Sequence, residues 1–381
     1  MKKHQILLFI VTIVVITMIV GCARTNNAST IPDPSETSSN SSETTTIPSE
    51  IESSESSRDS VLRTIVDMKG NAIEITGDVN RYLVLWKSYT GVMAMLDKCE
   101  GLVGCDYNIE SARDAWLFEI CPEASDLTIV TEEITAEEVA NLDVDVLFWQ
   151  NANCEELANQ CIKLGIPAVN INFEDYETMK QSILIAAEVL GTESAKDIAS
   201  KFNAYLDQTI LAIGEKAKEI SDAERVNILN LRNVKDLRAD GKGTVADTWI
   251  ECIGAINIVG AHNLEGNQYL DIEQLYDWNP DIIVSSVSGD DKLMYDDPQF
   301  APLSAVKNKK VYVNPNGIFY WNRYSVETPL QLYWAASTFY PERYPDIDII
   351  LEAQSFYLDF FNYEISNGNI ERMLNGLEPQ P

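Results

Sequence analysis

The stretch Ser194–Ile220 constrains the fold more than any other part of this chain. It contains no proline, and its apolar residues recur at steps of three and four, the pattern of one apolar helix face. At ~1.5 Å per residue the predicted helix is roughly 40 Å long. Thr192 is a candidate N-cap, and Gly214 is the predicted weak point, because glycine costs roughly 1 kcal/mol relative to alanine inside a helix. We interpret the helix as a spine between two lobes; the alternative is a surface helix of one large domain.

The N-terminus has the pattern of a lipoprotein signal peptide. Lys2 and Lys3 precede an uncharged, mostly aliphatic run that ends at Gly21, which is too short for a confident membrane span of ~20 apolar residues. The run closes with Ile-Val-Gly before Cys22, the form of a bacterial lipobox, and this predicts that Cys22 is lipidated. We expect residues 1–21 to be a signal peptide and the body to be anchored at the extracytoplasmic face of the membrane. An uncleaved anchor helix is the alternative.

Residues 22–60 begin with the lipidated cysteine and continue in Ser, Thr, Asn, Pro and Glu, with almost no large apolar side chain. Such a segment cannot bury a core, so we expect a disordered tether. The formal net charge of −31 argues against nucleic acid as a partner and against flat docking on anionic lipid. The only histidines are His4, in the signal peptide, and His262, which excludes a histidine-rich metal site.

Predicted strands and helices alternate on both sides of the spine. This alternation is typical of parallel sheets covered by helices. We predict an N-terminal α/β lobe over residues 61–175, connecting helices that include the spine over 176–221, and a C-terminal α/β lobe with a helical tail over 222–381. The predicted fold is therefore α/β: two parallel-sheet lobes joined by one long rigid α-helix, with a ligand cleft between them.

One short pattern occurs in both halves and favours two similar lobes. In the first half Glu137 lies in a short predicted helix, and Asp145, eight residues on, opens an apolar strand. In the second half Glu273 and Asp281 have the same spacing and the same surroundings. The pattern is weak by itself, but it falls on either side of the spine.

Aromatic, cationic and amide residues follow the predicted strands of both halves. Ligands of open parallel sheets bind beyond the carboxyl ends of the strands, and aromatic walls with Arg and Lys suit a flat or bulky anionic ligand. Each residue taken singly could instead pack at the edge of the core, so it is their coincidence that indicates a cleft. The candidate ligand-binding residues are Trp86, Lys87, Tyr89, Tyr107, Asn108, Trp149, Gln150, Arg232, Tyr320, Trp321 and Arg323.

Signals of catalysis are few. The sequence has no G-x-S-x-G, no Walker loop and no His–Cys or His–Ser pair, and Gly241-x-Gly243 lacks the third glycine of a dinucleotide fingerprint. We therefore expect no catalytic residue, no resident metal and no cofactor. An acidic stretch suggests a solvated loop in preference to a Ca²⁺ site, because its spacing is not that of an EF-hand; its residues are Asp290, Asp291, Asp296 and Asp297.

Six cysteines remain beyond Cys22, and none forms a Cys-x-x-Cys motif. Buried free thiols are the expected state, and a bridge among Cys99, Cys105 and Cys121 is the alternative.

Four loose motifs, taken together in their order and spacing, resemble one family over most of the chain from Arg63 onward. They are the segment Val66–Ile75, the strand at Tyr82–Leu85, the Glu-to-Asp pattern of each lobe, and the segment Trp321–Ala336. The chain thereby resembles the substrate-binding lipoproteins of ABC importers for ferric siderophores, haem and cobalamin. The resemblance implies a shallow cleft, modest closure on the ligand, and a permease with its ATPase as partners. It also implies that Glu137 and Glu273 meet the permease, although neighbouring Glu138 blurs the first assignment. We also expect a monomer.

The ligand class follows from the resemblance and from one departure. With His262 as the only available histidine, a bis-imidazole haem site is ruled out and one axial histidine is doubtful. Arg232, Arg323 and Lys87 favour an anionic ferric chelate, and cobalamin held by aromatic side chains is the next candidate. A chelatase-like enzyme on a two-lobed fold and a surface interaction protein without a transport role are alternatives from other classes.

Overall fold

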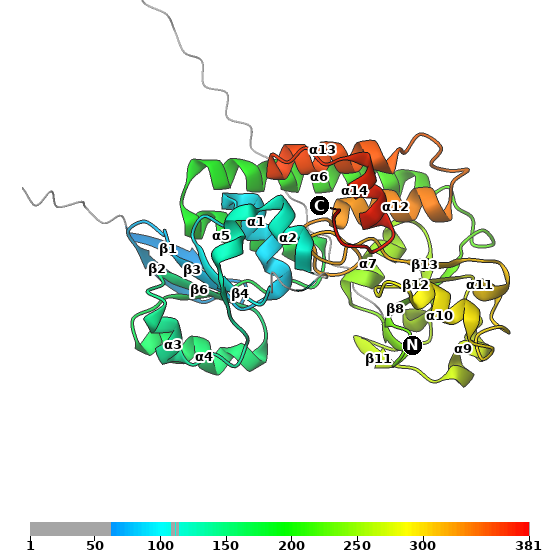
Figure 1. Cartoon of the computed structure of the whole chain (residues 1–381), viewed down its shortest axis with the longest axis horizontal. Coiled ribbons are helices and arrows are strands. Elements are labelled where there is room, and N and C mark those ends of the chain that lie inside the picture. Colours follow the sequence, from blue (N-terminus) through cyan, green and yellow to red (C-terminus); the bar gives the residue numbers. More distant parts are fainter. Residues whose placement is uncertain (1–61, 108–110, 112–113, 381) are drawn as a thin grey trace, which may run out of the picture. The chain divides into compact units, whose positions relative to one another are not determined.

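The computed structural model describes residues 62–107, 111 and 114–380, within one compact unit that runs from Arg58 to Pro381 (Figure 1). The expected signal peptide, lipidated Cys22 and the tether of residues 22–60 lie outside the described residues, and so does Asn108. Of the helices in the described part, none is long and apolar enough to cross a membrane.

The N-terminal lobe is the expected parallel sheet with helices on both faces. Its five strands have the order β5-β4-β3-β6-β7, and all neighbouring pairs are parallel. A hairpin precedes the sheet and consists of β1 (Leu62–Val66) and β2 (Ala72–Thr76). The sheet strands are β3 (Tyr82–Val84), β4 (Leu102–Cys105), β5 (Thr128–Ile129), β6 (Val146–Trp149) and β7 (Ala168–Asn170). The helices are α1 (Thr90–Asp97), α2 (Ala115–Ile120), α3 (Ala136–Asn141), α4 (Ala152–Lys163) and α5 (Tyr176–Leu190), with 3₁₀ turns at Lys87–Tyr89 and Pro122–Asp126.

The C-terminal lobe has a mixed sheet in the order β11-β9-β8-β12-β13, with β10 also paired to β8. Strands β8, β10, β12 and β13 are parallel, whereas β9 and β11 run antiparallel to their neighbours. The strands are β8 (Asn227–Asn233), β9 (Arg238–Asp240), β10 (Ile256–Asn257), β11 (Asn267–Tyr269), β12 (Ile282–Ser285) and β13 (Val311–Val313). The helices are α7 (Val245–Cys252), α8 (Ile258–Ala261), α9 (Ile272–Trp278), α10 (Asp290–Asp296), α11 (Ser304–Lys307), α12 (Thr328–Phe339), α13 (Ile349–Phe361) and α14 (Asn367–Leu374).

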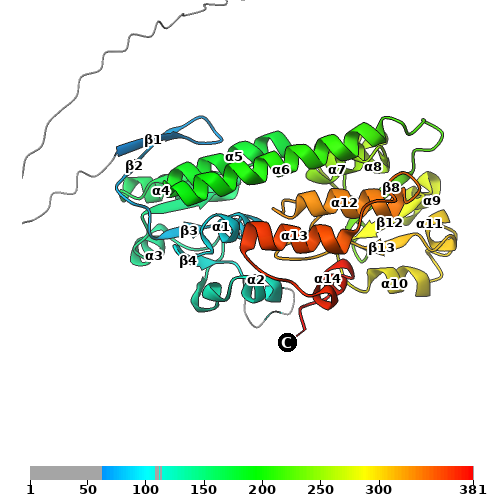
Figure 2. The same cartoon turned by 90° about the horizontal axis from the view of Figure 1, so that it is seen from above.

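The predicted spine is helix α6 (Glu193–Ala217), and it runs along both lobes (Figures 1 and 2). It contacts α1 and α5 of the N-terminal lobe and α7 and α12 of the C-terminal lobe. The Thr192 hydroxyl accepts a hydrogen bond from the Ala195 amide, which confirms the expected N-cap. The prediction of two α/β lobes joined by one long helix is therefore confirmed.

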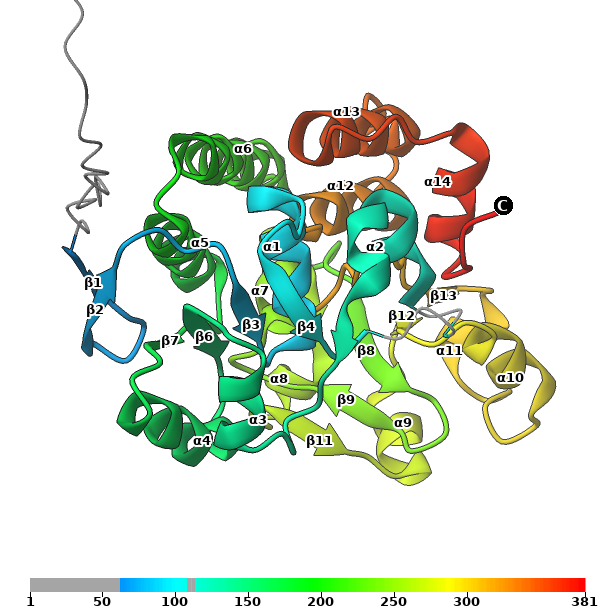
Figure 3. The same ribbon diagram turned by 60° about the vertical axis from the view of Figure 1, so that its left-hand side comes forward.

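Alternate residues of each central strand enter different cores. Tyr82 and Val84 of β3 belong to one continuous core that reaches from the first lobe through α6 into the second. Leu83 of β3 faces a separate cluster under α3 and α4, and Leu229 of β8 faces another beneath α9 to α11. Figure 3 shows α6, α12 and α13 side by side above the shared core. Because the lobes share this core, bending between them would expose apolar surface, which opposes wide opening.

The structure corrects one sequence expectation. The acidic stretch that was expected to be a solvated loop forms helix α10. Its first residue, Asp290, is buried and accepts hydrogen bonds from the Val234 amide and the Ser285 hydroxyl, while Met294 enters the core. The helix forms because one aspartate has buried donors and one face is apolar, neither of which is visible in a run of acidic residues.

Candidate ligand-binding cleft

An aromatic cluster joins the two lobes at the carboxyl ends of their strands. Trp86 follows β3, and its ring centre lies 4.9 Å from Phe173, which follows β7, and 5.4 Å from Tyr324 of the second lobe. The Phe173 and Tyr324 rings are also in edge contact at 5.7 Å. Trp86 remains half-buried, so its indole can reach a ligand at this junction.

Lys87 has a carboxylate partner beside this cluster. Its Nζ lies 2.9 Å from both carboxylate oxygens of Asp114, and 4.6 Å from the centre of the Tyr107 ring. The Tyr107 hydroxyl in turn donates to the carbonyl of Ile318 in the second lobe, at 2.8 Å. Tyr107 is therefore a buried link between the lobes, and the charge of Lys87 is largely compensated before any ligand arrives.

Several predicted ligand-binding residues are partly or fully buried. Tyr89 is fully buried, and its hydroxyl donates to the Ser182 carbonyl. Trp321 is fully buried, and Trp149 is nearly so, with the Lys69 ammonium over its ring. Gln150 is half-buried and donates to Asn172. The strand-end rule selected residues by their position along the chain, and it did not distinguish exposed side chains from these buried ones.

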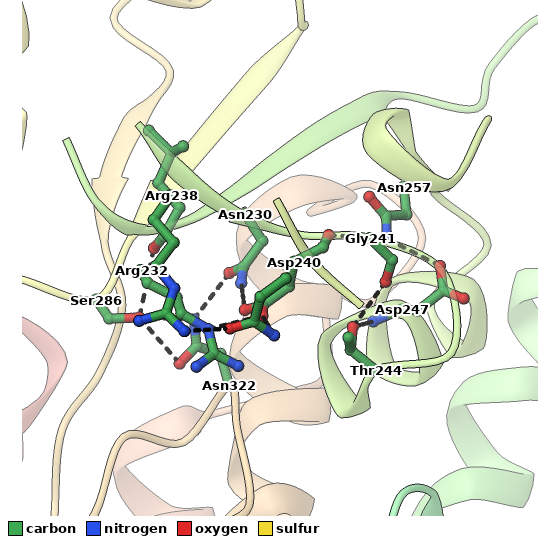
Figure 4. Close-up of polar contacts among 12 residues, drawn as sticks. Asn230, Arg232, Arg238, Asp240, Gly241, Thr244, Asp247, Asn257, Ser286 and Asn322 are labelled. Carbon is green, nitrogen blue, oxygen red and sulfur yellow. Dashed lines mark hydrogen bonds and ion pairs between the residues drawn. The ribbon is translucent and has the colours of Figure 1, made fainter. Parts of the chain in front are cut away.

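Three arginines of the second lobe, Arg232, Arg238 and Arg323, lie near one another. The surface that they form is called the arginine wall below. Arg232 pairs through Nε with Asp240 at 2.8 Å, and Arg238 donates to the Asn267 amide oxygen at 3.0 Å (Figure 4). Burial lowers the pKa of Arg323 to about 10, helped by the positive charges of Arg232 and Arg238. Arg323 therefore remains a cation near neutral pH.

Arg323 has no carboxylate within ion-pair distance among the described residues. Its guanidinium lies over the Tyr320 ring at 4.4 Å and the Phe319 ring at 5.3 Å, and its Nε is buried without a hydrogen-bond partner. A buried cationic donor without an acceptor costs free energy unless an anion meets it. This arginine therefore indicates where an anionic ligand would bind.

A buried polar network underlies the arginines (Figure 4). Asp240, which is 1% exposed, accepts from Arg232 and from the Asn230 amide at 3.0 Å. Asn230 accepts from Asn322 at 2.8 Å, and Asn322 also contacts the Ser286 hydroxyl. These groups come from β8, β9, the end of β12 and the loop before α12, so the network ties four segments together under the binding wall.

Glu327 holds the loop that carries Tyr320, Arg323 and Tyr324. It is fully buried and accepts from the amides of Ile318 and Phe319, from the Ser325 hydroxyl and from the Tyr357 hydroxyl. Burial raises the pKa of this carboxyl, and the four donors oppose that effect. The conformation of the loop therefore depends on one carboxylate at its base.

The C-terminal segment borders the same wall. The Trp116 indole of the first lobe donates to the Leu377 carbonyl at 2.9 Å. Beside it lies a cavity of about 240 Å³, whose lining residues are Ser286, Val287, Ser288, Asn316, Tyr320, Gly376 and Glu378. Tyr320 thus belongs both to the arginine wall and to a small polar cavity covered by the tail.

His262 and the cysteines belong to the residue types that commonly bind metal ions. The His262 ring stacks on Trp278 at 4.3 Å and its Nδ1 contacts the Ile258 carbonyl at 2.8 Å. The six thiols of the described part are free, and five of them are buried. Within the described ranges, no group of three or more His, Cys, Asp or Glu side chains is placed to hold a metal ion.

The two glutamates of the internal repeat occupy equivalent positions. Glu137 is the second residue of α3 and Glu273 the second residue of α9; both are exposed, and both helices begin with a capping box. Glu138 is also exposed, but its carboxylate bonds to Thr135 in the capping box of α3, whereas Glu137 has no part in that capping box.

The aspartates of the repeat also match. Asp145 accepts from the amides of Asn80 and Arg81 before β3, and Asp281 accepts from the amide of Asn227 at the start of β8. In each lobe the repeat thus combines an exposed glutamate on a short helix with an aspartate that accepts hydrogen bonds at the start of the central strand.

Sequence reasoning missed four residues of the cleft. Phe173 could have been selected by the strand-end rule, because it follows the apolar strand β7. Tyr324 lies next to the predicted Arg323. Arg238 and Asp240 belong to β9, an antiparallel strand that the parallel pattern did not predict.

Comparisons with known proteins place the chain in context. A family model described as periplasmic binding protein matches residues 86–316. The molybdate-binding protein MolA of Haemophilus influenzae is 24% identical over 336 residues, covering 81% of this chain and 94% of that protein.

Solved structures share the fold. A periplasmic solute-binding protein from Veillonella parvula has a TM-score of 0.72 and 24% identity, covering 83% of this chain and 97% of its own. MolA bound to molybdate gives a TM-score of 0.72 at 22% identity, covering 80% and 99%. Ceue of Helicobacter pylori with Ni(II) bound gives 0.67 at 20% identity, covering 82% and 99%.

Proposed function

This chain belongs to the periplasmic binding protein family, and on that premise we propose that it captures an anionic metal-containing ligand and delivers it to an ABC permease. Proteins of this kind bind small ligands outside the cytoplasm and work with a permease and its ATPase. To this general role the proposal adds two points: the ligand is anionic, and it binds at the arginine wall of the second lobe. It further includes attachment to the membrane through Cys22 and action as a monomer.

The observation that carries the proposal is the unpaired guanidinium of Arg323. Arg232 is paired with Asp240, whereas Arg323 has no carboxylate at ion-pair distance among the described residues; it lies over aromatic rings, is repelled by Arg232 and Arg238, and feels Asp240 only at longer range. An anion at this point would satisfy the buried Nε and offset the repulsion. A neutral ligand would do neither.

Two kinds of anion fit this wall. An anionic ferric chelate would use the aromatic cluster around Trp86 together with the arginines. A compact oxyanion is the second candidate, because MolA, a relative over most of its length, is named for binding molybdate. The direct contact of Trp86 and Tyr324 across the lobes leaves less room for a bulky ligand and so favours the compact one.

A titration separates the candidates. The body from Arg58 onward would be titrated with molybdate, a ferric siderophore, haem and cobalamin, with tryptophan fluorescence and a thermal shift as readouts. One of the anions should bind tightly. Binding of cobalamin alone, or of none of the four, would contradict the proposal.

The variant Arg323→Ala tests the role of the wall. It should weaken an anionic ligand by about 2 kcal/mol or more, roughly thirtyfold in Kd, because a buried charge partner is lost. Arg343→Ala is the matched control, since Arg343 pairs with Glu224 at the surface away from the wall. Equal affinities of wild type and Arg323→Ala would show that the ligand binds elsewhere.

Glu137 and Glu273 are the proposed docking residues for the permease. Their equivalent positions on α3 and α9 give each lobe one exposed carboxylate. Such rim charges act mainly on the association rate and its salt dependence. Glu137→Gln with Glu273→Gln should slow association with the permease at low salt and leave ligand affinity unchanged; an unchanged association rate would contradict the assignment.

A further inference from the structure

A groove lies between the edge of the first sheet and helix α3. It has a volume of about 450 Å³, and its lining residues are Thr128, Ile129, Val130, Thr131, Glu133, Ile134, Glu138, Asn141 and Leu142. Within the described part, β5 pairs only with β4, so the outer edge of β5 has no partner strand. An open strand edge beside a groove offers backbone groups as well as side chains to a partner.

The floor of the groove is apolar and open to solvent. Ile129 is 57% exposed, and neighbouring Ile134 and Leu142 are half-buried. Val130 beneath them belongs to the core of the lobe. A large exposed isoleucine on an edge strand is a feature that soluble proteins usually cover or interrupt with charge. Here no lysine or arginine interrupts it among the lining residues.

The rim of the groove is acidic. Glu133 and Glu138 line it, and both are exposed. The backbone amide and hydroxyl of Thr135 lower the pKa of Glu138, so its carboxylate stays ionised over the whole physiological range. An apolar floor whose charged neighbours are both acidic is complementary to an apolar side chain flanked by lysine or arginine.

The position of the groove identifies the partner. Glu137, the proposed docking residue, is the residue before Glu138 on α3. A partner that contacts Glu137 therefore lies within reach of the groove. Figure 1 shows α3 on the side of the lobe opposite the spine α6.

We propose that this groove binds an extended segment of the permease that carries an apolar side chain flanked by basic residues. The proposal rests on the proposed function, since it takes the permease to be the partner. Carboxylates such as Glu137 mainly raise the rate of association with the permease, and the apolar contact in the groove would add affinity for it.

The test uses the permease–ATPase complex of the same transport system, reconstituted in lipid nanodiscs. Ile129→Asp places a charge on the floor of the groove and should raise the Kd for this complex at least tenfold. Glu133→Lys reverses a rim charge and should weaken binding and reduce its salt dependence. Leu211→Asp is the matched control, because Leu211 is 62% exposed on α6, and it should bind the permease as wild type does.

The outcomes distinguish the groove from the proposed function. If the wild type binds the permease and both Ile129→Asp and Glu133→Lys bind it equally well, the groove proposal is wrong and the proposed function stands. If the wild type does not bind the permease, both fail. Ligand titration should give the same affinity for the wild type and the three variants. A loss of ligand affinity in Ile129→Asp would show that this variant damages the lobe. In that case the permease affinity of Glu133→Lys decides whether the groove proposal stands. A concentration-dependent dimer that Ile129→Asp abolishes would assign the groove to a second copy of this chain and overturn the proposal.

Discussion

Gly317→Ala should be among the most damaging small substitutions in this protein. Gly317 lies in the loop that Glu327 holds, and a Cβ built on it would overlap Oε1 of Glu327 and lie 2.5 Å from the Tyr357 hydroxyl oxygen. Neither atom can move freely, because the carboxylate already accepts four hydrogen bonds and both residues are fully buried. The methyl group can be accommodated only if the carboxylate leaves its donors or the loop shifts.

The expected loss in the free energy of unfolding follows from the hydrogen bonds that Glu327 would lose. A hydrogen bond to a charged group contributes about 1.5–3 kcal/mol, and a buried donor left without an acceptor costs about 1–3 kcal/mol. Displacing Glu327 from two of its four donors therefore costs about 3–5 kcal/mol, a large part of a domain's net stability of about 5–15 kcal/mol. Gly214→Ala is the matched control. Nothing lies within 4 Å of a Cβ at this position in α6, so alanine should stabilise the protein by about 0.5–1 kcal/mol.

Urea unfolding of the body from Arg58 onward measures both effects. The two Gly→Ala changes should shift the free energy of unfolding in opposite directions. Ligand titration adds a second readout: Gly317→Ala should weaken ligand binding at temperatures where it is still folded, because the loop carries Arg323. Equal stabilities of Gly317→Ala and wild type would refute the role given to Glu327. A destabilising Gly214→Ala would refute the description of α6 as an ordinary helix with one weak position.

Three further predictions concern pH, fluorescence and capping. Burial raises the pKa of Asp97 from 3.8 to about 6, so the folded state holds this proton more tightly than the unfolded state. Its contribution to stability is therefore present below pH 4 and lost as the pH rises to 7, by about 3 kcal/mol in the difference between wild type and Asp97→Asn. Trp86→Phe should remove much of the fluorescence change on ligand binding, because Trp86 is the half-buried tryptophan at the junction of the lobes. Thr192→Ala should lower the free energy of unfolding by about 1 kcal/mol through loss of the α6 N-cap.

Each of the three has a clear contrary result. A difference between wild type and Asp97→Asn that does not change with pH would mean that the carboxyl titrates alike in the folded and unfolded states. A full fluorescence response in Trp86→Phe would place the ligand away from the aromatic cluster. A Thr192→Ala variant as stable as wild type would show that the cap contributes nothing to α6.

The supporting fold was largely predictable from the sequence because it depends on local patterns. The helix α6 follows from apolar residues at steps of three and four with Thr192 before them. The parallel strands follow from short apolar runs separated by helical segments. The internal repeat is also a local pattern in the sequence, but the bonds of its aspartates are not local, since Asp145 and Asp281 accept amides of residues distant in the sequence at the start of each central strand.

The candidate site was predictable only in outline. The rule that ligands bind beyond the strand ends selected Trp86, Arg232 and Arg323, which the structure leaves half-buried near the junction of the lobes, because the rule depends on the direction of strands alone. It also selected Tyr89 and Trp321, which the structure buries. Burial depends on which distant segments pack over a residue, and a single sequence does not contain those contacts.

The sequence by itself determined the two lobes, the spine that joins them and the edge at which a ligand would meet them, because periodicity and strand direction are set by neighbours along the chain. The tertiary structure alone decided which charges are compensated. Lys87 has Asp114 and Arg232 has Asp240, whereas Arg323 has no such partner among the described residues. The reason is physical: compensation of a charge depends on atoms a few ångströms away, and these atoms come from separate elements that only the folded structure brings together, such as β8 and β9 for Arg232 and Asp240.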